Sequence, residues 1–204
     1  KPAGLYPETK GLAERAVLEA NGNGLATVAV RPPLIWGAGD TSLLPQLIDA
    51  IHAGQWMWFD GGHYPHSSTH VRNVVEGLML AAEKGRGGEV YFISDGPPRD
   101  FREFIESLLK TRGVDGGNRK IPLWIAKWVA NITDPVWSML GTKNPPPVPK
   151  ALIYIMAQKL TVNDAKARRE LGYRGAVTLE EGLQAMEAQG SAQKVKGSCQ
   201  SLCP

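Results

Sequence analysis

Cysteine is nearly absent from this sequence, and so are candidate metal ligands around the two that occur. Cys199 and Cys203 both lie close to the C-terminus, in a segment rich in Gly, Ser and Lys. No His or further Cys stands at the spacing of a zinc site, so we expect flexible thiols and no metal. The lack of cysteine elsewhere fits a reducing compartment, and we expect a cytoplasmic protein.

The sequence also lacks a strong excess of charge and a long uninterrupted hydrophobic run. Its formal net charge is only +3, and the basic residues are scattered, so we expect no nucleic-acid partner. The most apolar segment, residues 122–140, is broken by Lys127, Asp134 and Pro135, which disfavours a transmembrane span. A core helix is the simplest interpretation of this segment. A lid over an apolar pocket and a membrane-surface contact are the alternatives.

Hydrophobic periodicity predicts an alternation of helices and short strands. Apolar residues recur at helical spacing over residues 12–20, and Asn21-Gly22-Asn23-Gly24 ends that helix. The same reasoning predicts helices at residues 41–53, with Thr41 and Ser42 as caps, and at 71–83, 100–110, 164–171 and 179–187, and β-rich segments at 25–30, 56–69 and 89–94. Helices alternating with short apolar strands indicate an α/β fold.

Tyr6 and Lys10 form the motif with the clearest chemistry. Residues four apart share a helix face, and Pro7 suits the first turn of a helix. An ammonium group near a phenol favours the phenolate, so such a tyrosine can exchange a proton with an alcohol or carbonyl oxygen near neutral pH. The spacing alone is common by chance, and an unremarkable surface pair is the alternative.

The segments that follow this pair resemble the extended short-chain dehydrogenases/reductases. These enzymes carry an Arg-Pro strand end and then a turn of the form aromatic-Gly-x-Gly-Asp, which match Arg31-Pro32 and Trp36-Gly37-Ala38-Gly39-Asp40 here. The resemblance continues in the same order through residues 68–75, 88–93, 167–173 and 179–183. It covers about residues 1–188.

The resemblance implies a fold, a division of the chain and roles for several residues. The implied fold is a partial Rossmann-like parallel sheet with flanking helices, plus a small, mostly helical substrate-binding part. Residues 1–189 would be the C-terminal portion of such an enzyme, and residues 190–204 a disordered tail. The implied roles are catalysis and cofactor binding for Tyr6 and Lys10, cofactor binding for Pro32 and Pro33, and substrate contact for Leu34 and His66.

At two positions the sequence differs from the nucleotide-sugar enzymes of this family, which indicates the branch it resembles. Nucleotide-sugar epimerases and dehydratases commonly carry an Arg that clamps the diphosphate where His66 stands, and a polar residue where Leu34 stands. The sequences at residues 60–62 and 71–77, together with the apolar segment 122–140, resemble the 3β-hydroxysteroid dehydrogenase and sterol-4-carboxylate dehydrogenase branch. A steroid-like or other apolar small molecule is therefore the expected substrate, although His63 and His66 also fit a solvated loop.

A glycine-rich turn between a strand and a helix, which would hold the cofactor pyrophosphate, is not found. Gly85-Arg86-Gly87-Gly88 leads into an expected strand instead. We therefore expect a portion of a longer chain, and the sequence does not separate NAD from NADP. The remaining alternatives are a nucleotide-sugar epimerase or dehydratase and a catalytically silent fragment without a nucleotide site. A homodimer is compatible with the sequence.

Overall fold

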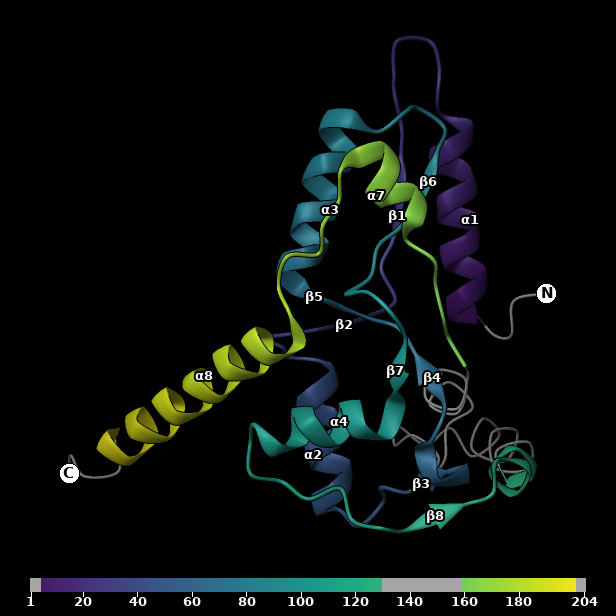
Figure 1. Cartoon of the computed structure of the whole chain (residues 1–204). Helices are drawn as coiled ribbons and strands as arrows, with labels where there is room; N and C mark the ends of the chain where they lie inside the picture. Colours follow the sequence, from purple (N-terminus) through teal and green to yellow (C-terminus); the bar gives the residue numbers. More distant parts are fainter. Residues whose placement is uncertain (1–4, 130–158, 201–204) are drawn as a thin grey trace.

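The computed structural model describes residues 5–129 and 159–200 as an α/β arrangement with two hydrophobic cores (Figure 1). The elements follow in the order α1 (Leu5–Glu19), β1 (Ala29–Arg31), β2 (Leu34–Trp36), α2 (Leu43–His52), β3 (Trp58–Phe59), η1 (Asp60–Gly62), β4 (Pro65–His66), β5 (Ser68–His70), α3 (Val71–Lys84), β6 (Val90–Phe92), β7 (Arg99–Asp100), α4 (Phe101–Lys110), β8 (Lys120–Ile121), α7 (Ala165–Leu171) and α8 (Leu179–Gln200). The expected α/β fold class is confirmed.

Parallel pairing dominates the short strands. β1 pairs with β6 so that Ala29 faces Val90 and Arg31 faces Phe92. The pairs β2–β5 and β3–β8 are also parallel, whereas β4–β7 is antiparallel. Among the described residues, no strand pairs with the other edge of β1.

The first core lies among α3, β6 and α7, and we call these elements with α1 and β1 the sheet unit. In Figure 1, α1 and α3 stand on either side of β1 and β6. The core is mainly small and aliphatic, with two buried tyrosines; its buried members are Val74, Ala81, Tyr91, Ile93, Ala167, Leu171 and Tyr173. By contrast, no side chain among residues 7–19 of α1 is fully buried.

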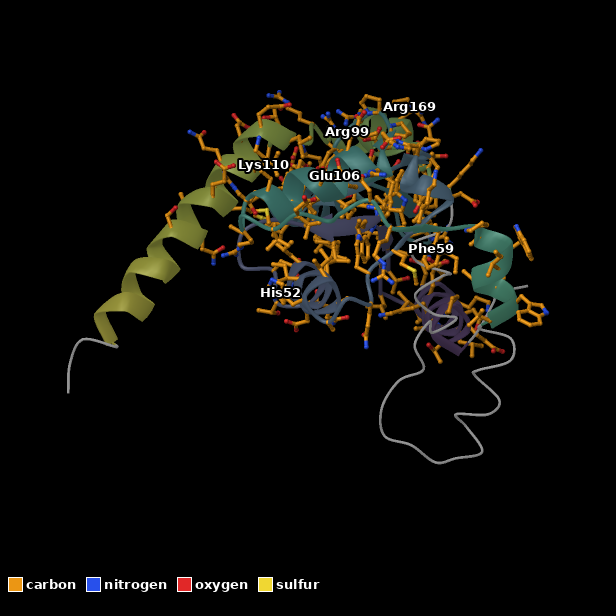
Figure 2. All side chains as sticks on the ribbon, turned by 90° about the horizontal axis from the view of Figure 1, so that it is seen from below. His52, Phe59, Arg99, Glu106, Lys110 and Arg169 are labelled. Carbon is orange, nitrogen blue, oxygen red and sulfur yellow. The ribbon has the colours of Figure 1, made fainter. Side chains whose placement is uncertain are left out.

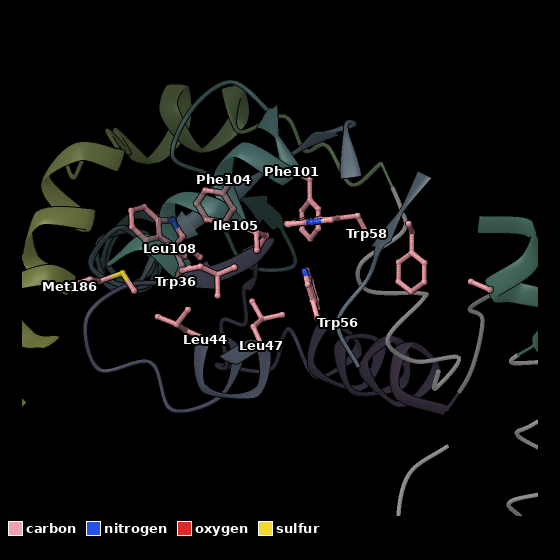
Figure 3. Close-up of a cluster of buried hydrophobic side chains, with 13 residues drawn as sticks. Trp36, Leu44, Leu47, Trp56, Trp58, Phe101, Phe104, Ile105, Leu108 and Met186 are labelled. Atoms are coloured by element: carbon pink, nitrogen blue, oxygen red, sulfur yellow. The ribbon is translucent and has the colours of Figure 1, made fainter. Parts of the chain in front are cut away.

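The second core is rich in aromatic rings, and we call α2, β3, η1, α4 and β8 the aromatic unit. Figure 3 shows rings from several segments turned toward one another; the buried members are Trp36, Leu44, Leu47, Trp56, Trp58, Phe59, Phe101, Phe104, Ile105, Leu108, Leu109, Ala126 and Met186. The outer face of α4 is polar, and Glu106 and Lys110 point away from this core (Figure 2). This amphipathic pattern explains why residues 101–110 fold as a helix on the core surface.

Two helix boundaries differ from expectation. Ser42 takes the N-cap position of α2 but makes no side-chain cap. The capping acceptor is Asp40, whose carboxylate accepts from the backbone N–H groups of Ser42, Leu43 and Leu44 at 2.8–3.0 Å. At the other end of the chain, α8 continues to Gln200, into the range where we expected a disordered tail. The division of the chain at residue 189 stays a prediction.

The segment 122–140 lies only partly within the described residues. Residues 123–129 are helical, and Ala126 is buried there, but Trp124 and Trp128 are 72% and 63% exposed. This is not the pattern of a core helix, because its largest apolar side chains face outward. None of the described helices has the length and hydrophobicity needed to span a bilayer.

Candidate active site

Helix α1 carries the proposed Tyr6–Lys10 pair. Both residues lie in this one helix, with Pro7 in its first turn, as the spacing predicted. Lys10 is an exposed residue, whereas the side chain of Tyr6 lies outside the described side chains. The backbone thus places the pair on one flank of the helix N-terminus, and the catalytic role of the pair stays a prediction.

The Pro32-Pro33-Leu34 segment connects the β1–β6 strand pair to the β2–β5 strand pair. It leaves β1 at Arg31 and enters β2, which lies beside β5 in parallel register. All three residues are half-buried, and Leu34 packs against the aromatic core. A ligand held at this segment would therefore have the sheet unit on one side and the aromatic rings on the other.

His66, the second proposed substrate residue, is not in a solvated loop. It lies in β4, is only 5% exposed, and meets Phe101 edge to face with ring centroids 5.1 Å apart. Tyr64 stacks on the ring of Phe101 as well, with ring centroids 5.0 Å apart. His63 behaves as expected of a solvated loop, since its side chain is 61% exposed and its Nδ1 lies 3.3 Å from Asp100.

Asp40 and His70 both cap helices. Desolvation acts to raise the pKa of Asp40, but hydrogen bonds from the backbone of Leu44, Ser42 and Leu43 outweigh it and hold the pKa below its ordinary value. His70 caps α3, with its Nδ1 accepting from the N–H of Arg72 at 3.3 Å. Burial lowers the pKa of His70, against the opposing effect of Asp95, so its imidazole is neutral at pH 7.

Asp95 is the residue that sequence reasoning missed. Its carboxylate accepts from Trp36 Nε1 and Asn73 Nδ2, each at 2.7 Å, from the His70 N–H at 2.7 Å and from Ser68 Oγ at 3.2 Å. These donors come from β2, β5 and α3. Asp95 follows β6, so the only local signal was its position just beyond a strand end. Its carboxylate thus joins the ends of β2 and β5 to the start of α3.

A cavity of about 510 Å³ lies beside His70, between the start of α3 and α8. Its lining includes Ala38, Arg72, Glu181 and Gly182 and none of the proposed site residues. Within the described parts of the chain, no three His, Cys, Asp or Glu side chains gather as metal ligands do. This cavity is thus separate from the proposed site residues on α1 and in the Pro32–Leu34 segment.

Comparison with known proteins identifies relatives of the same kind over most of this chain. A ketoreductase of Stigmatella aurantiaca, named for a 4-hydroxy-2-methyl-3-oxo-4-farnesyl-3,4-dihydroquinoline-1-oxide, is 47% identical over 94% of this chain and 58% of its own length. A decarboxylating sterol-4-alpha-carboxylate 3-dehydrogenase of Mus musculus is 33% identical over 90% of this chain and 54% of its own length. The chain thus spans little more than half of these relatives.

The fold has solved counterparts. A double mutant of the dTDP-glucose 4,6-dehydratase of Streptomyces venezuelae, crystallised with NAD, superposes with a TM-score of 0.63. It covers 95% of this chain and 53% of the dehydratase chain at 21% identity, which establishes a common Rossmann-like fold. The sequence model of the 3-beta hydroxysteroid dehydrogenase/isomerase family matches residues 1–123, from the Tyr6–Lys10 helix through β8. The expected resemblance is confirmed, and the chain belongs to the 3-beta hydroxysteroid dehydrogenase/isomerase family.

Proposed function

We propose that the intact protein containing this chain is a cytoplasmic NAD(P)-dependent oxidoreductase acting on a secondary alcohol or ketone of an apolar small molecule. The observation that carries this proposal is the match to the family across residues 1–123, with Tyr6 and Lys10 four residues apart on one helix. Both relatives described above are named as a reductase or a dehydrogenase of such groups.

The residues present fit one end of the cofactor only. Tyr6, Lys10, Pro32 and Pro33 suit the nicotinamide ribose side. A strand–turn–helix for the pyrophosphate does not occur among the described residues, and the glycines at 85–88 lie between α3 and β6. The nicotinamide, when bound, supplies the hydride chemistry that no side chain can provide. The acidic or basic residue that reads the ribose 2′ position, and so separates NAD from NADP, would lie in another part of the intact protein.

The mechanism assigns the proton to Tyr6. The phenol oxygen exchanges a proton with the substrate oxygen, and the ammonium group of Lys10 stabilises the phenolate that remains after reduction. Pro32 and Pro33 line the cofactor side. Leu34 and His66 contact the substrate, and the aromatic rings behind them exclude water from its apolar part.

The first experiment is Tyr6→Phe in the intact protein. We expect turnover to fall by about three orders of magnitude or more, because the proton relay is lost, while NAD(P)H fluorescence titration shows nearly unchanged binding. Tyr91→Phe is the matched control, since its hydroxyl lies in the sheet unit and contacts Glu170 at 3.3 Å. Retained turnover in Tyr6→Phe would refute the assigned role.

The substrate class rests on two observations. The relatives' names contain a farnesylated quinoline oxide and a sterol carboxylate, both largely apolar. In this chain, buried His66 stands where a diphosphate clamp needs a permanent cation, which disfavours the alternative of a nucleotide-sugar epimerase or dehydratase. Steroid alcohols should raise the melting temperature of the intact protein, and UDP-sugars should not. If no nicotinamide cofactor binds at all, the catalytically silent alternative holds.

Membrane-surface contact is part of the proposal. Trp124 and Trp128 lie four residues apart, both largely exposed, with exposed Lys127 beside them. Tryptophan and lysine in this arrangement suit the headgroup region of a bilayer. Co-sedimentation with anionic vesicles should weaken in a Trp124→Ser/Trp128→Ser variant. Homodimer formation also stays a prediction, to be checked by light scattering of the intact protein.

A further inference from the structure

A charged pair connects α1 to the exit of β1. The carboxylate of Glu14 accepts from Arg31 through both oxygens, with Arg31 Nε lying 2.6 Å from Oε2 and Arg31 Nη2 contacting Oε1. This is the bidentate arrangement that fixes a guanidinium and a carboxylate in one plane. Helix and strand are thus connected by two parallel hydrogen bonds.

Glu14 occupies a defined position relative to the proposed catalytic pair. Tyr6, Lys10 and Glu14 follow one another at intervals of four residues, so they lie along one flank of α1. Arg31 is the last residue of β1, directly before Pro32 and Pro33. The ion pair therefore joins the helix flank that carries Tyr6 and Lys10 to the segment expected to line the cofactor.

Arg31 is held from a second side. Its guanidinium lies over the ring of Phe92, 5.1 Å from the ring centroid, and Phe92 is its register partner in β6. The hydrogen bonds from Arg31 hold the pKa of Glu14 below its ordinary value despite desolvation, so the carboxylate is charged at neutral pH. The side chain of Arg31 is 43% exposed and that of Glu14 is 23% exposed, so the pair lies at the surface with its carboxylate partly shielded from solvent.

Hydrophobic packing by itself leaves the rotation of α1 weakly determined. None of the side chains of residues 7–19 is fully buried, and Leu12 and Val17 are 51% and 44% exposed. A helix with so little burial can rotate or slide at small cost unless polar contacts fix it. The bidentate pair is directional and supplies that constraint.

We propose that Glu14 and Arg31 are positioning residues, which set the rotation of α1 against the β1 exit and thereby place Tyr6 and Lys10 relative to the cofactor and substrate. The inference rests on the proposed function for its catalytic consequence. The anchoring of α1 is independent of that function. A displacement of about 1 Å of reacting groups can lower a rate by about 100-fold, so a pair distant from the chemistry can matter.

The test compares Glu14→Gln with the charge-exchanged double variant Glu14→Arg/Arg31→Glu in the intact protein. We expect Glu14→Gln to lower kcat about 10- to 100-fold with cofactor Kd changed less than about threefold. The limb of the pH profile that reports Tyr6 should stay in place, because Tyr6 and Lys10 belong to the same helix and are displaced together. The double variant should regain a large part of the lost kcat. Glu170→Gln, which removes the remote contact with Arg86, is the matched control and should leave kcat and the pH profile unchanged.

Amide hydrogen exchange provides a second measurement that does not depend on activity. Glu14→Gln should speed exchange in the peptide covering α1 and leave the peptide covering α3 unchanged. An unchanged kcat together with unchanged exchange in α1 would overturn the proposal, and so would a loss of kcat that the double variant fails to restore. An inactive unmodified protein with faster α1 exchange in Glu14→Gln would refute the proposed function and uphold the anchoring.

Discussion

The sheet unit and the aromatic unit hold their elements in place by different means. In the aromatic unit, tryptophan and phenylalanine rings from several segments are buried together, and α4 contributes residues that are almost entirely inaccessible (Figure 3). In the sheet unit, the core is smaller and lies on the α3 and α7 side, whereas α1 is joined to β1 through Glu14 and Arg31. The helix that carries the proposed chemistry is therefore positioned by directional polar contacts, and the substrate side by burial.

The largest expected effect comes from breaking the aromatic core. Trp58 is 1% exposed, donates its Nε1–H to the carbonyl oxygen of Gly117 at 2.9 Å, and lies 5.0 Å beneath the guanidinium of Arg102. Trp58→Ala should destabilise the intact protein by about 3–5 kcal/mol, measured by denaturant unfolding. Trp124→Ala removes the same side chain from an exposed position and should change stability by about 0.5 kcal/mol or less. Equal losses in the two variants would contradict the assignment of Trp58 to the core.

The next largest effect is expected where α8 packs against Trp36 and His70. Gly182 of α8 lies so close to Trp36 and His70 that a Cβ would stand 2.5 Å from the Trp36 ring. Gly182→Ala should cost about 1–3 kcal/mol by overpacking, since the ring is buried and cannot move aside. Gly11→Ala in α1 has open space around it and should stabilise by about 0.5–1 kcal/mol. Calorimetry should therefore show changes in stability of opposite sign for Gly182→Ala and Gly11→Ala. Such a result would distinguish the tightly packed contact of α8 from the lightly packed α1.

The smallest expected effect concerns the start of α2. Because the folded-state pKa of Asp40 is depressed, its contribution to stability is present above the ordinary pKa of about 3.9 and is lost as the pH falls through the folded value. Asp40→Ala should lower the Tm at pH 7 by about 2–4 °C, as expected for a lost helix cap, and the difference should shrink below about pH 4. Asp49→Ala on the same helix is the control, and a pH-independent deficit would contradict the capping role.

Local patterns predicted the elements well where the pattern was strong. Residues 71–83 were expected to be helical from their apolar spacing, and α3 covers Val71–Lys84. The apolar run at residues 25–30 predicted a strand longer than the observed β1. The strand is shorter because it pairs with only three residues of β6, Val90–Phe92. An apolar run shows that a segment can be a strand, whereas the length of the strand depends on its partner.

The proposed site was predictable in its motifs and not in its supporting contacts. The Tyr6–Lys10 spacing and the family resemblance were readable from the sequence, and the family is confirmed. Burial of His66 depends on Phe101, which lies far along the chain. The hydrogen bonds to Asp95 join residues up to 59 positions apart, and the Glu14–Arg31 pair joins residues 17 positions apart. No local periodicity encodes such contacts.

Among the residues that the structure describes, one edge of β1 has no strand partner, and this has a consequence for handling the polypeptide in the laboratory. Exposed N–H and C=O groups along a strand accept a further strand from any neighbour of suitable register, including another copy. When this 204-residue polypeptide is expressed by itself at high concentration, we expect copies to associate through this strand edge and aggregate. Low protein concentration should therefore favour dispersed molecules.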